Sequence, residues 1–344
     1  MSRRWGAPSV FALAVALLGG AVLLALGWGS VSIPWSAMPS LFWQWISGSP
    51  LSPPAMVLWE IRLPRILLAG IIGGVLAVVG ASLQALLRNA LADPYVLGVS
   101  SGAALGAVIG GLVSQQLHEA RFVLFLCAFG GSVLTLLLLY RVSSVNGLLP
   151  VQTLLLAGVV INAVFSALVL FAVAMVEPSR LFGLLSWLMG SIGSADYRIV
   201  GLLAVYSAVG LFFLISRADQ LNLLSLGEES AQSLGVAPER AKRLIFIATA
   251  LLTGAVVSLS GMIGFIGMMV PHALRLVMGP DHRRLLPAAA IVGAAFLILA
   301  DLVARAALSP TELPVGVITA LLGGPFFLYL LWQRRHGALL GERE

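Results

Sequence analysis

Apolar runs of about twenty residues recur along the whole sequence, separated by short segments that carry proline or charge. A run of this length spans the hydrocarbon layer of a bilayer as a helix, which satisfies its own backbone hydrogen bonds there. Only 10% of the 344 residues are charged and 60% are hydrophobic, too few charges to cover a soluble protein. The pattern excludes a water-soluble globular protein and predicts an all-α polytopic membrane protein.

The boundaries of the apolar runs predict about ten transmembrane helices in a single transmembrane domain that covers residues 1–344. The runs fall at 9–29, 62–86, 94–113, 121–140, 148–175, 196–216, 241–262, 263–279, 286–308 and 314–333. The first run follows Arg3 and Arg4, as in a signal peptide, but it is too long and lacks a small-x-small cleavage site. We therefore expect an uncleaved first helix.

The positions of Lys and Arg test this count, because cytoplasmic loops hold most of the basic residues of membrane proteins. With ten helices and the N-terminus inside, 14 of the 20 basic residues, Arg3, Arg4 and Arg343 among them, lie on the inner side. The outer side then holds only Arg62, Arg65, Arg121, Arg180, Arg198 and Arg305. Omitting the short run 263–279 would remove this bias. The charges therefore favour ten helices with both termini in the cytoplasm.

Three connecting segments differ from the others in size or composition. The outer, periplasmic segment 30–55 is rich in tryptophan and proline, and 177–195 forms a second periplasmic loop. The inner segment 217–240 is the most polar stretch, yet it contains five leucines. This combination predicts short amphipathic helices broken at Gly227 and Gly235, with an apolar face that rests on another surface.

Small residues recur at helical spacing. Gly98, Gly102, Gly106 and Gly110 are four residues apart, which predicts one helix face that another helix approaches closely. We expect this face to pack within one subunit rather than between subunits. Gly261, Gly264 and Gly267 predict a loosened junction between the seventh and eighth helices.

Several kinds of chemistry are missing from the sequence. The only lysine, Lys242, does not stand in a phosphate-binding GxxxxGK[ST] loop, so any ATP must be hydrolysed by a partner. The four histidines (His118, His272, His282 and His336) have no metal-ligand spacing, and no catalytic set converges within a helix. The basic residues are scattered, which argues against nucleic-acid binding despite the net charge of +6. We predict a chain that is not an enzyme, with no catalytic residue, metal or cofactor of its own.

Asp301 is the ionisable residue nearest to the membrane interior. It precedes Arg305 by four residues, a spacing that allows an intrahelical ion pair. We favour this pair over a proton relay, because the sequence does not line the bilayer centre with the ionisable residues of ion-coupled carriers.

Several motifs, read together, closely resemble the FecCD family, the permease subunits of type II ABC importers for vitamin B12, haem and ferric siderophores. They include Arg62-Leu-Pro-Arg65, the stretch 80–103, Leu226-Gly-Glu-Glu229 with Ser233-Leu-Gly-Val236, the stretch 264–283, and Glu312-Leu-Pro-Val-Gly316. They appear in the family's order between about residues 57 and 333. The resemblance implies ten helices, cytoplasmic termini, and a homodimer with a central translocation pathway in the bacterial inner membrane. The implied partners are a second copy, two ATP-binding cassette subunits that hold ATP and Mg²⁺, and a periplasmic substrate-binding protein.

The resemblance also implies roles for individual residues. Arg62, Arg65 and Arg305 match the arginines that dock the periplasmic binding protein. The coupling helices that contact the ATPase correspond to Leu226, Gly227, Glu228, Glu229, Leu234 and Gly235. The cytoplasmic gate corresponds to Asn89, Leu91, Ser143 and Ser144. The family usually has proline after the asparagine, where this chain has Ala90, so the chain departs from the family at this turn.

Two functions stay open at this point. The first is an ABC importer permease, and the second is a secondary transporter or channel that works without an ATPase. The second would leave the polar inner segment 217–240 without a role. Within the first, the sequence does not distinguish ferric siderophore, haem and corrinoid as substrates.

Overall fold

The computed structural model describes residues 7–29, 33–95, 97–113, 120–144, 148–193 and 196–341. Arg3, Arg4, His118 and Arg343 lie outside these ranges. The regular elements of the described residues are helices: α1 (Ala7–Gly27), η1 (Trp35–Ala37), α2 (Met38–Ile46), α3 (Pro53–Met56), η2 (Val57–Arg62), α4 (Leu63–Leu86), α5 (Val99–Val113), α6 (Ala120–Ser143), α7 (Val151–Ala174), α8 (Pro178–Leu188), α9 (Tyr197–Ser216), α10 (Ala218–Leu226), α11 (Glu228–Ser233), α12 (Pro238–Ser260), α13 (Ile266–Met278), α14 (His282–Ala306) and α15 (Val315–Gly341).

Seven described helices are long and apolar enough to cross a membrane: α1, the continuous helix 53–86 that ends in α4, and α6, α7, α9, α12 and α14. The apolar parts of α5, α13 and α15 are shorter. Each predicted apolar run coincides with one of these helices. The all-helical membrane fold is therefore confirmed, while the number of ten crossings stays a prediction.

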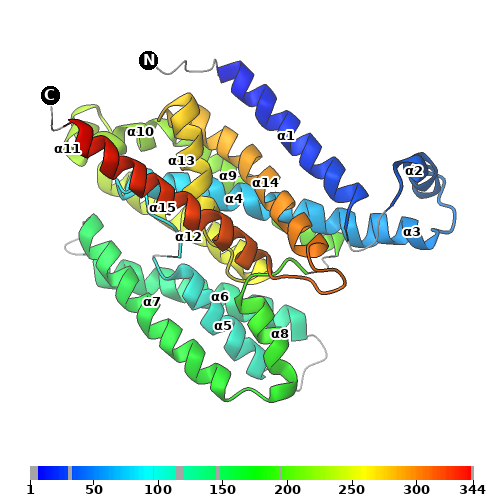
Figure 1. Cartoon of the computed structure of the whole chain (residues 1–344). Coiled ribbons are helices and arrows are strands. Elements are labelled where there is room, and N and C mark those ends of the chain that lie inside the picture. The colour runs from blue at the N-terminus through cyan, green and yellow to red at the C-terminus, as the bar shows by residue number, and fades with distance from the viewer. Residues whose placement is uncertain are drawn as a thin grey trace.

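Helix α4 is the centre of the bundle. Almost every residue along it is buried, and it packs against α14, α13, α12 and α9 (Figure 1). A side chain at Gly73 would clash with the carbonyl of Gly293 on α14, and one at Gly80 would clash with Gly267 of α13. Glycine at these positions allows the backbones to approach closely, which is how helices pack without a hydrophobic driving force in lipid.

The predicted glycine stripe lies on α5 and packs against α6. Gly102 and Gly106 contact the backbone of α6 at Gly131 and Cys127. The expectation of packing within one subunit is thus confirmed for this face. Gly98 does not extend the stripe as predicted, because it lies in the turn before α5 with φ +77°, a conformation that favours glycine.

The two predicted outer segments contain helices of their own. Within 30–55 the chain forms η1 and α2, which project from the body beside α3 (Figure 1). Trp59 of η2 stacks on Trp45 of α2, with ring centroids 5.0 Å apart, and donates a hydrogen bond to Leu41. The second membrane helix begins at Pro53 rather than at residue 62. In the described part of 177–195, α8 forms between Pro178 and Leu188.

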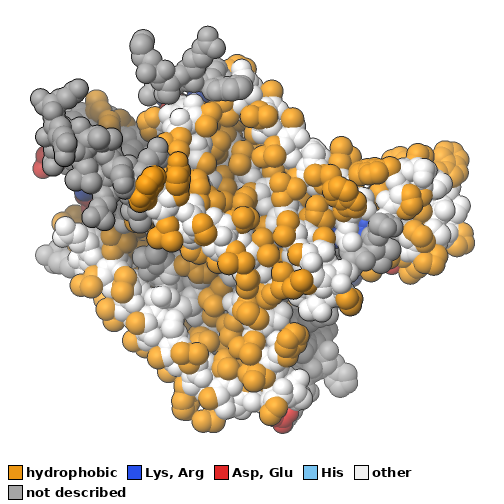
Figure 2. All heavy atoms as spheres, in the orientation of Figure 1, with side chains coloured by type: hydrophobic (Ala, Val, Ile, Leu, Met, Phe, Trp, Pro, Cys, Tyr) orange, Lys and Arg blue, Asp and Glu red, His pale blue; other side chains and the backbone are white. Residues whose placement is uncertain are grey.

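The surface of the bundle is apolar over large areas. Figure 2 shows hydrophobic side chains spread over most of one face of the molecule. Leu156, Leu170 and Phe171 on α7 are among the exposed hydrophobic side chains. Continuous exposed apolar surface of this extent is typical of a protein whose solvent is lipid.

Candidate functional site

The residues singled out by the sequence lie at the two ends of the bundle. One end holds α10, α11 and the end of α15, and we call it the α11 end (Figure 1). The other end holds α2, α3 and the turn between α14 and α15, and we call it the α2 end. The arginines matched to the docking of a binding protein lie at the α2 end. The residues matched to ATPase coupling lie at the α11 end.

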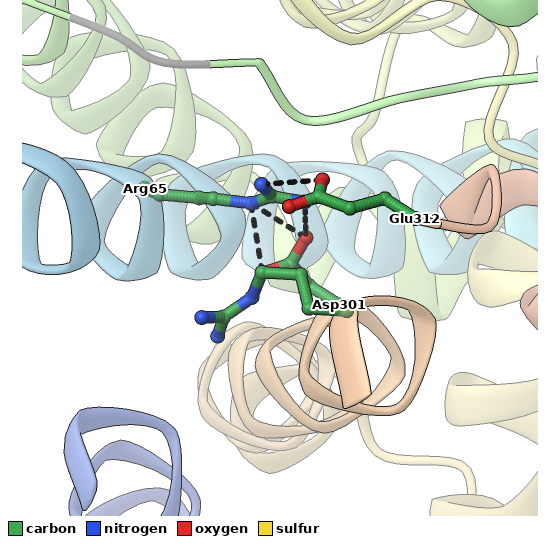
Figure 3. A network of polar contacts seen from close by, with 4 residues as sticks. Arg65, Asp301 and Glu312 are labelled. Carbon is green, nitrogen blue, oxygen red and sulfur yellow. Dashed lines mark hydrogen bonds and ion pairs between the residues drawn. The ribbon is translucent and has the colours of Figure 1, made fainter. Parts of the chain in front are cut away.

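A network of charged side chains joins three segments at the α2 end. Arg65 of α4 contacts Asp301 of α14, with Nη2 2.9 Å from Oδ1, and also Glu312, with Nη1 2.8 Å from Oε2 (Figure 3). Arg305 contacts the other oxygen of Asp301, with Nε 2.9 Å from Oδ2. The predicted pair between Asp301 and Arg305 is confirmed. Arg65 and Glu312 join that pair from positions far away in the sequence, and nothing in the spacing indicated this.

This network carries more positive than negative charge. Arg62 lies beside Arg305, since a side chain placed at Gly29 would touch both guanidinium groups. The network therefore contains three guanidinium groups and two carboxylates. Arg62 donates hydrogen bonds to the carbonyl oxygens of Leu26 and Gly27, at 2.7 and 3.3 Å. Nη2 of Arg305 is buried with no hydrogen-bond partner among the described residues. An additional acceptor would satisfy this group, since buried donors are rarely left unpaired.

The structure brings the three predicted docking arginines together but buries them. The exposed fractions of Arg62, Arg65 and Arg305 are 3%, 8% and 4%. The side chain of Glu312, by contrast, is 46% exposed. The three arginines therefore give the α2 end a positive potential without projecting from its surface.

At the α11 end, the polar segment forms two short helices as predicted. They are separated at Gly227, where φ is +121°, and α11 is followed by Gly235, where φ is +86°. Glycine tolerates both conformations at no steric cost. A Cβ atom at Gly227 would stand 3.7 Å from a guanidinium nitrogen of Arg88, so the segment lies beside the turn that follows α4.

The leucines of this segment divide into two groups. Leu221 and Leu224 are buried in the main core and hold α10 on the bundle. Leu226 and Leu234 point outward and are 69% and 62% exposed. Two exposed leucines on a polar segment leave an apolar surface that a partner can cover.

Polar contacts fix α10 to the start of α14. Asn222 donates a hydrogen bond to Oδ1 of Asp281 at 2.8 Å and accepts one from the backbone of His282 at the same distance. Asp281 also caps α14 by accepting from the backbone of Arg283 at 3.1 Å. The pKa of Asp281 is lowered mainly because its carboxylate accepts the hydrogen bond from Asn222.

The four predicted gate residues lie in two places, the turn after α4 and the end of α6. In the turn after α4, Oδ1 of Asn89 accepts from the backbone of Leu91 at 2.9 Å, and Leu91 is exposed. Ser143 ends α6 as a fully buried residue, and Ser144 follows it. No described hydrogen bond joins the two pairs.

A cavity of about 470 Å³ lies beside the junction between α12 and α13. Its lining is mostly apolar and includes Met189, Met262, Phe265, Met268 and Val317. Asp93 and Tyr95 are the lining residues with polar side chains, and Asp93 accepts a hydrogen bond from the backbone of Tyr95 at 2.9 Å. A lining of this kind gives little chemical indication of a particular substrate.

Comparisons with known proteins agree with this arrangement. The model of the FecCD transport family matches residues 16–333. An uncharacterized ABC transporter permease protein of Bacillus subtilis, YvrB, is 38% identical over 335 residues, which cover 96% of this chain and 95% of the relative. The vitamin B12 import system permease protein BtuC of Escherichia coli is 42% identical over 290 residues, covering 84% and 88%. A solved structure of a metal-chelate type ABC transporter in an inward-facing conformation matches with a TM-score of 0.81 at 30% identity, covering 95% and 99%.

The fold and these relatives define a multi-pass membrane permease of the ABC importer type. The chain belongs to the FecCD transport family. The resemblance seen in the sequence motifs is therefore confirmed.

Proposed function

We propose that this chain is the permease subunit of an importer that moves a metal chelate from the periplasm to the cytoplasm across a bacterial inner membrane. A corrinoid such as cobalamin is the first candidate, because a relative 42% identical to this chain is a vitamin B12 permease. The chain would act as a single domain with ten crossings and both termini in the cytoplasm. It would hold no cofactor and catalyse no reaction.

The observation that carries this proposal is the exposed apolar surface of Leu226 and Leu234 at the α11 end. An apolar surface on a cytoplasmic segment fits a cleft of an ATP-binding cassette subunit better than it fits water. A homodimer of this chain would present two such surfaces, one to each of two ATPase subunits that bind ATP and Mg²⁺. Movement of those subunits would then open and close the central pathway.

The excess positive charge at the α2 end supports the second proposed partner. A periplasmic binding protein with acidic residues on its docking face would be attracted to this end, and its carboxylates would complete the arginine network. We propose that Arg62 and Arg305 act in this way. In the same proposal, Arg65 is a docking residue whose charge Glu312 partly neutralises before the partner binds.

The experiment that tests the proposal measures ATP hydrolysis by the complete complex. The chain is co-expressed with its ATPase subunit, reconstituted in lipid with its binding protein, and supplied in turn with cyanocobalamin, haem and a ferric siderophore. We expect the ATPase subunit to co-purify and one chelate to stimulate hydrolysis. Absence of an ATPase from the purified complex, together with transport that follows an ion gradient, would instead indicate a secondary transporter or channel.

A further inference from the structure

The lobe formed by η1, α2 and residues 53–59, which we call the α2 lobe, carries no charge. Between Arg4 and Glu60 the sequence has no aspartate, glutamate, lysine or arginine. Tryptophan is concentrated in the same region, since five of the eight tryptophans are Trp28, Trp35, Trp43, Trp45 and Trp59. Tryptophan prefers the interface between lipid and water, where its ring is apolar and its N–H group can bond to headgroups or water.

The tryptophans of the α2 lobe lie at the level where the first membrane helix ends. The apolar span of α1 has 20 residues and is about 30 Å long, which matches the hydrocarbon layer of a bilayer. At its last residue, Gly27, a Cβ atom would stand 2.6 Å from the ring of Trp35. Arg62 donates a hydrogen bond to the carbonyl of Gly27, and Trp59 precedes Arg62 by one turn, about 5 Å along the helix. The headgroup layer is about 5 to 7 Å thick, so these rings lie within it.

A second membrane helix ends at the same level. Tyr197 is the first residue of α9, which is also long and apolar enough to cross a membrane, and its hydroxyl donates a hydrogen bond to the carbonyl of Trp59. The ring of Trp59 contacts α2 through Trp45 and Phe42, with centroids 5.0 and 5.9 Å away. Helix α2 is therefore held at the level that the ends of α1 and α9 mark.

One side of α2 is held on the lobe, and the rest of its surface is apolar and exposed. Leu41 is buried, and Oε1 of Gln44 accepts hydrogen bonds from the backbone and the hydroxyl of Ser52 at 3.1 and 2.9 Å. The outward side chains are Phe42, Trp43, Trp45 and Ile46, which are 50%, 70%, 52% and 58% exposed. Figure 2 shows hydrophobic side chains on this projecting lobe as well as on the body of the bundle. Such a surface is unfavourable in water and favourable in lipid.

We propose that α2 is an interfacial anchor that rests on the bilayer at the α2 end, with its exposed aromatic side chains among the headgroups and upper acyl chains of uncharged lipids. Buried apolar area would hold the anchor, because the lobe has no basic residue to attract anionic lipid. A protein partner guided by charge would find none on this surface. The inference needs only that the bundle spans a membrane, and it is independent of the transported substrate.

The anchor would act on the central helix of the bundle. The helix 53–86 has 34 residues and is about 51 Å long, more than the roughly 30 Å of the hydrocarbon layer. A helix of excess length tilts or extends beyond the bilayer, and aromatic anchors at the interface help to fix its position. The α2 lobe carries these aromatic residues at the end of helix 53–86 that extends beyond α1.

The test measures how deeply α2 lies in a bilayer. Cys127 is the only cysteine, so a Cys127→Ala background with Ser40→Cys accepts one spin label on α2 and keeps every aromatic ring. Ser40 is exposed and lies one turn before Trp43, on the same side of the helix. The full chain is reconstituted in phosphatidylcholine, and electron paramagnetic resonance measures collisions of the label with oxygen and with a nickel chelate. Oxygen concentrates in acyl chains and the chelate in water, so their ratio gives a depth, which lipids labelled at known positions calibrate.

We expect the label to lie at the depth of the headgroups, and to stay there when salt or phosphatidylglycerol is added. The double variant Trp43→Ser with Ile46→Ser removes apolar area and should shift the label toward water. Phe182→Ser removes an equally exposed aromatic ring from α8 and should leave the depth unchanged. All three side chains are exposed, so neither variant disturbs the packed core.

Four results would overturn the proposal. A label as accessible to the nickel chelate as one in water would show that the lobe stands clear of the bilayer. A label shielded from both reagents and magnetically coupled to that of a second subunit would assign this face to contact between copies. A depth that appears only with phosphatidylglycerol and disappears with salt would indicate attraction to anionic lipid. Shielding that begins only when a periplasmic binding protein is added would assign the face to that protein.

Discussion

Several charged side chains of this bundle join one helix to another. Asp301 joins α14 to α4, and Asp281 joins α14 to α10 while capping its own helix. Such groups replace hydrogen bonds to water with hydrogen bonds to protein, so each removal leaves a partner unsatisfied.

Replacing Asp281 by Ala should lower stability by about 1 kcal/mol, the usual cost of a lost helix N-cap. The pKa of Asp281 is lowered in the folded protein, so its contribution is complete above the ordinary pKa of an aspartate, about 4, and is lost as pH falls through the folded value. Thermal unfolding in detergent between pH 3 and 7 measures both effects. If acid lowered the stability of the Asp281→Ala variant as much as that of the unsubstituted protein, the role given to Asp281 would be contradicted.

Replacing Ala90 by Pro, the residue usual in the family, should lower ATPase activity without substrate more than stimulated transport. The backbone nitrogen of Ala90 makes none of the described hydrogen bonds, so proline removes no contact. Proline restricts the backbone conformations of residues 89 and 90, an effect of roughly 1 kcal/mol, and so makes the gate turn more rigid. Basal and stimulated rates compared in the same lipid decide this, and equal basal rates would show that Ala90 is neutral.

Residue-level prediction from sequence was successful only where partners are close along the chain. The spacing of Asp301 and Arg305 was enough to predict their ion pair, because i,i+4 residues meet on a helix. The contacts of Arg65 with Asp301 and of Lys242 with Leu149 join positions far apart in sequence, and no local pattern encodes them. The burial of the docking arginines was missed for the same reason.

At the scale of helices, apolar length and glycine positions predict much of the arrangement. The apolar runs predicted each main helix. The short α13 was among them, because glycines and charged residues mark its ends. The early start of the second membrane helix was missed because Pro53 and Pro54 were interpreted as loop residues, although proline suits the first turn of a helix. Gly98 shared the helical spacing of the stripe but serves a turn instead.

The contact between α5 and α6 yields a prediction with a control on the same helix. A Cβ atom at Gly106 would stand 2.0 Å from the backbone oxygen of Cys127, whereas one at Gly111 would meet nothing within 4 Å. Gly106→Ala should therefore destabilise the protein by about 1 to 3 kcal/mol, and Gly111→Ala should not. Thermal unfolding of the two variants measures this difference. Equal stability would mean that the helices are not packed as described.

The segment of α10 and α11 should tolerate a charge at Leu226 without unfolding. Because Leu226 is exposed, Leu226→Asp should change stability by no more than about 0.5 kcal/mol, yet it should abolish coupling to the ATPase. Ser225→Asp adds the same charge in the same turn and keeps the leucine, so it should transport normally. Full transport by Leu226→Asp would exclude this leucine from the contact.

At the scale of the whole molecule, the two ends of the bundle are proposed to serve different partners. Arg62→Gln should slow association with the binding protein, most strongly at low ionic strength, because charges near an interface mainly steer the encounter. Arg198→Gln removes an exposed charge near the start of α9 and should have a smaller effect. Association rates measured at several salt concentrations test this. If both substitutions slowed association equally, the overall charge of the protein, rather than docking at Arg62, would explain the effect.

We propose that this chain imports its substrate with energy from ATP bound to partner subunits. The most direct measurement is chelate uptake by proteoliposomes that contain the permease, its ATPase and its binding protein, with ATP supplied or an ion gradient imposed. We expect uptake that requires ATP hydrolysis, stops with vanadate and persists when ionophores remove every gradient. Uptake that proceeds without nucleotide and ends when the gradient is removed would contradict it.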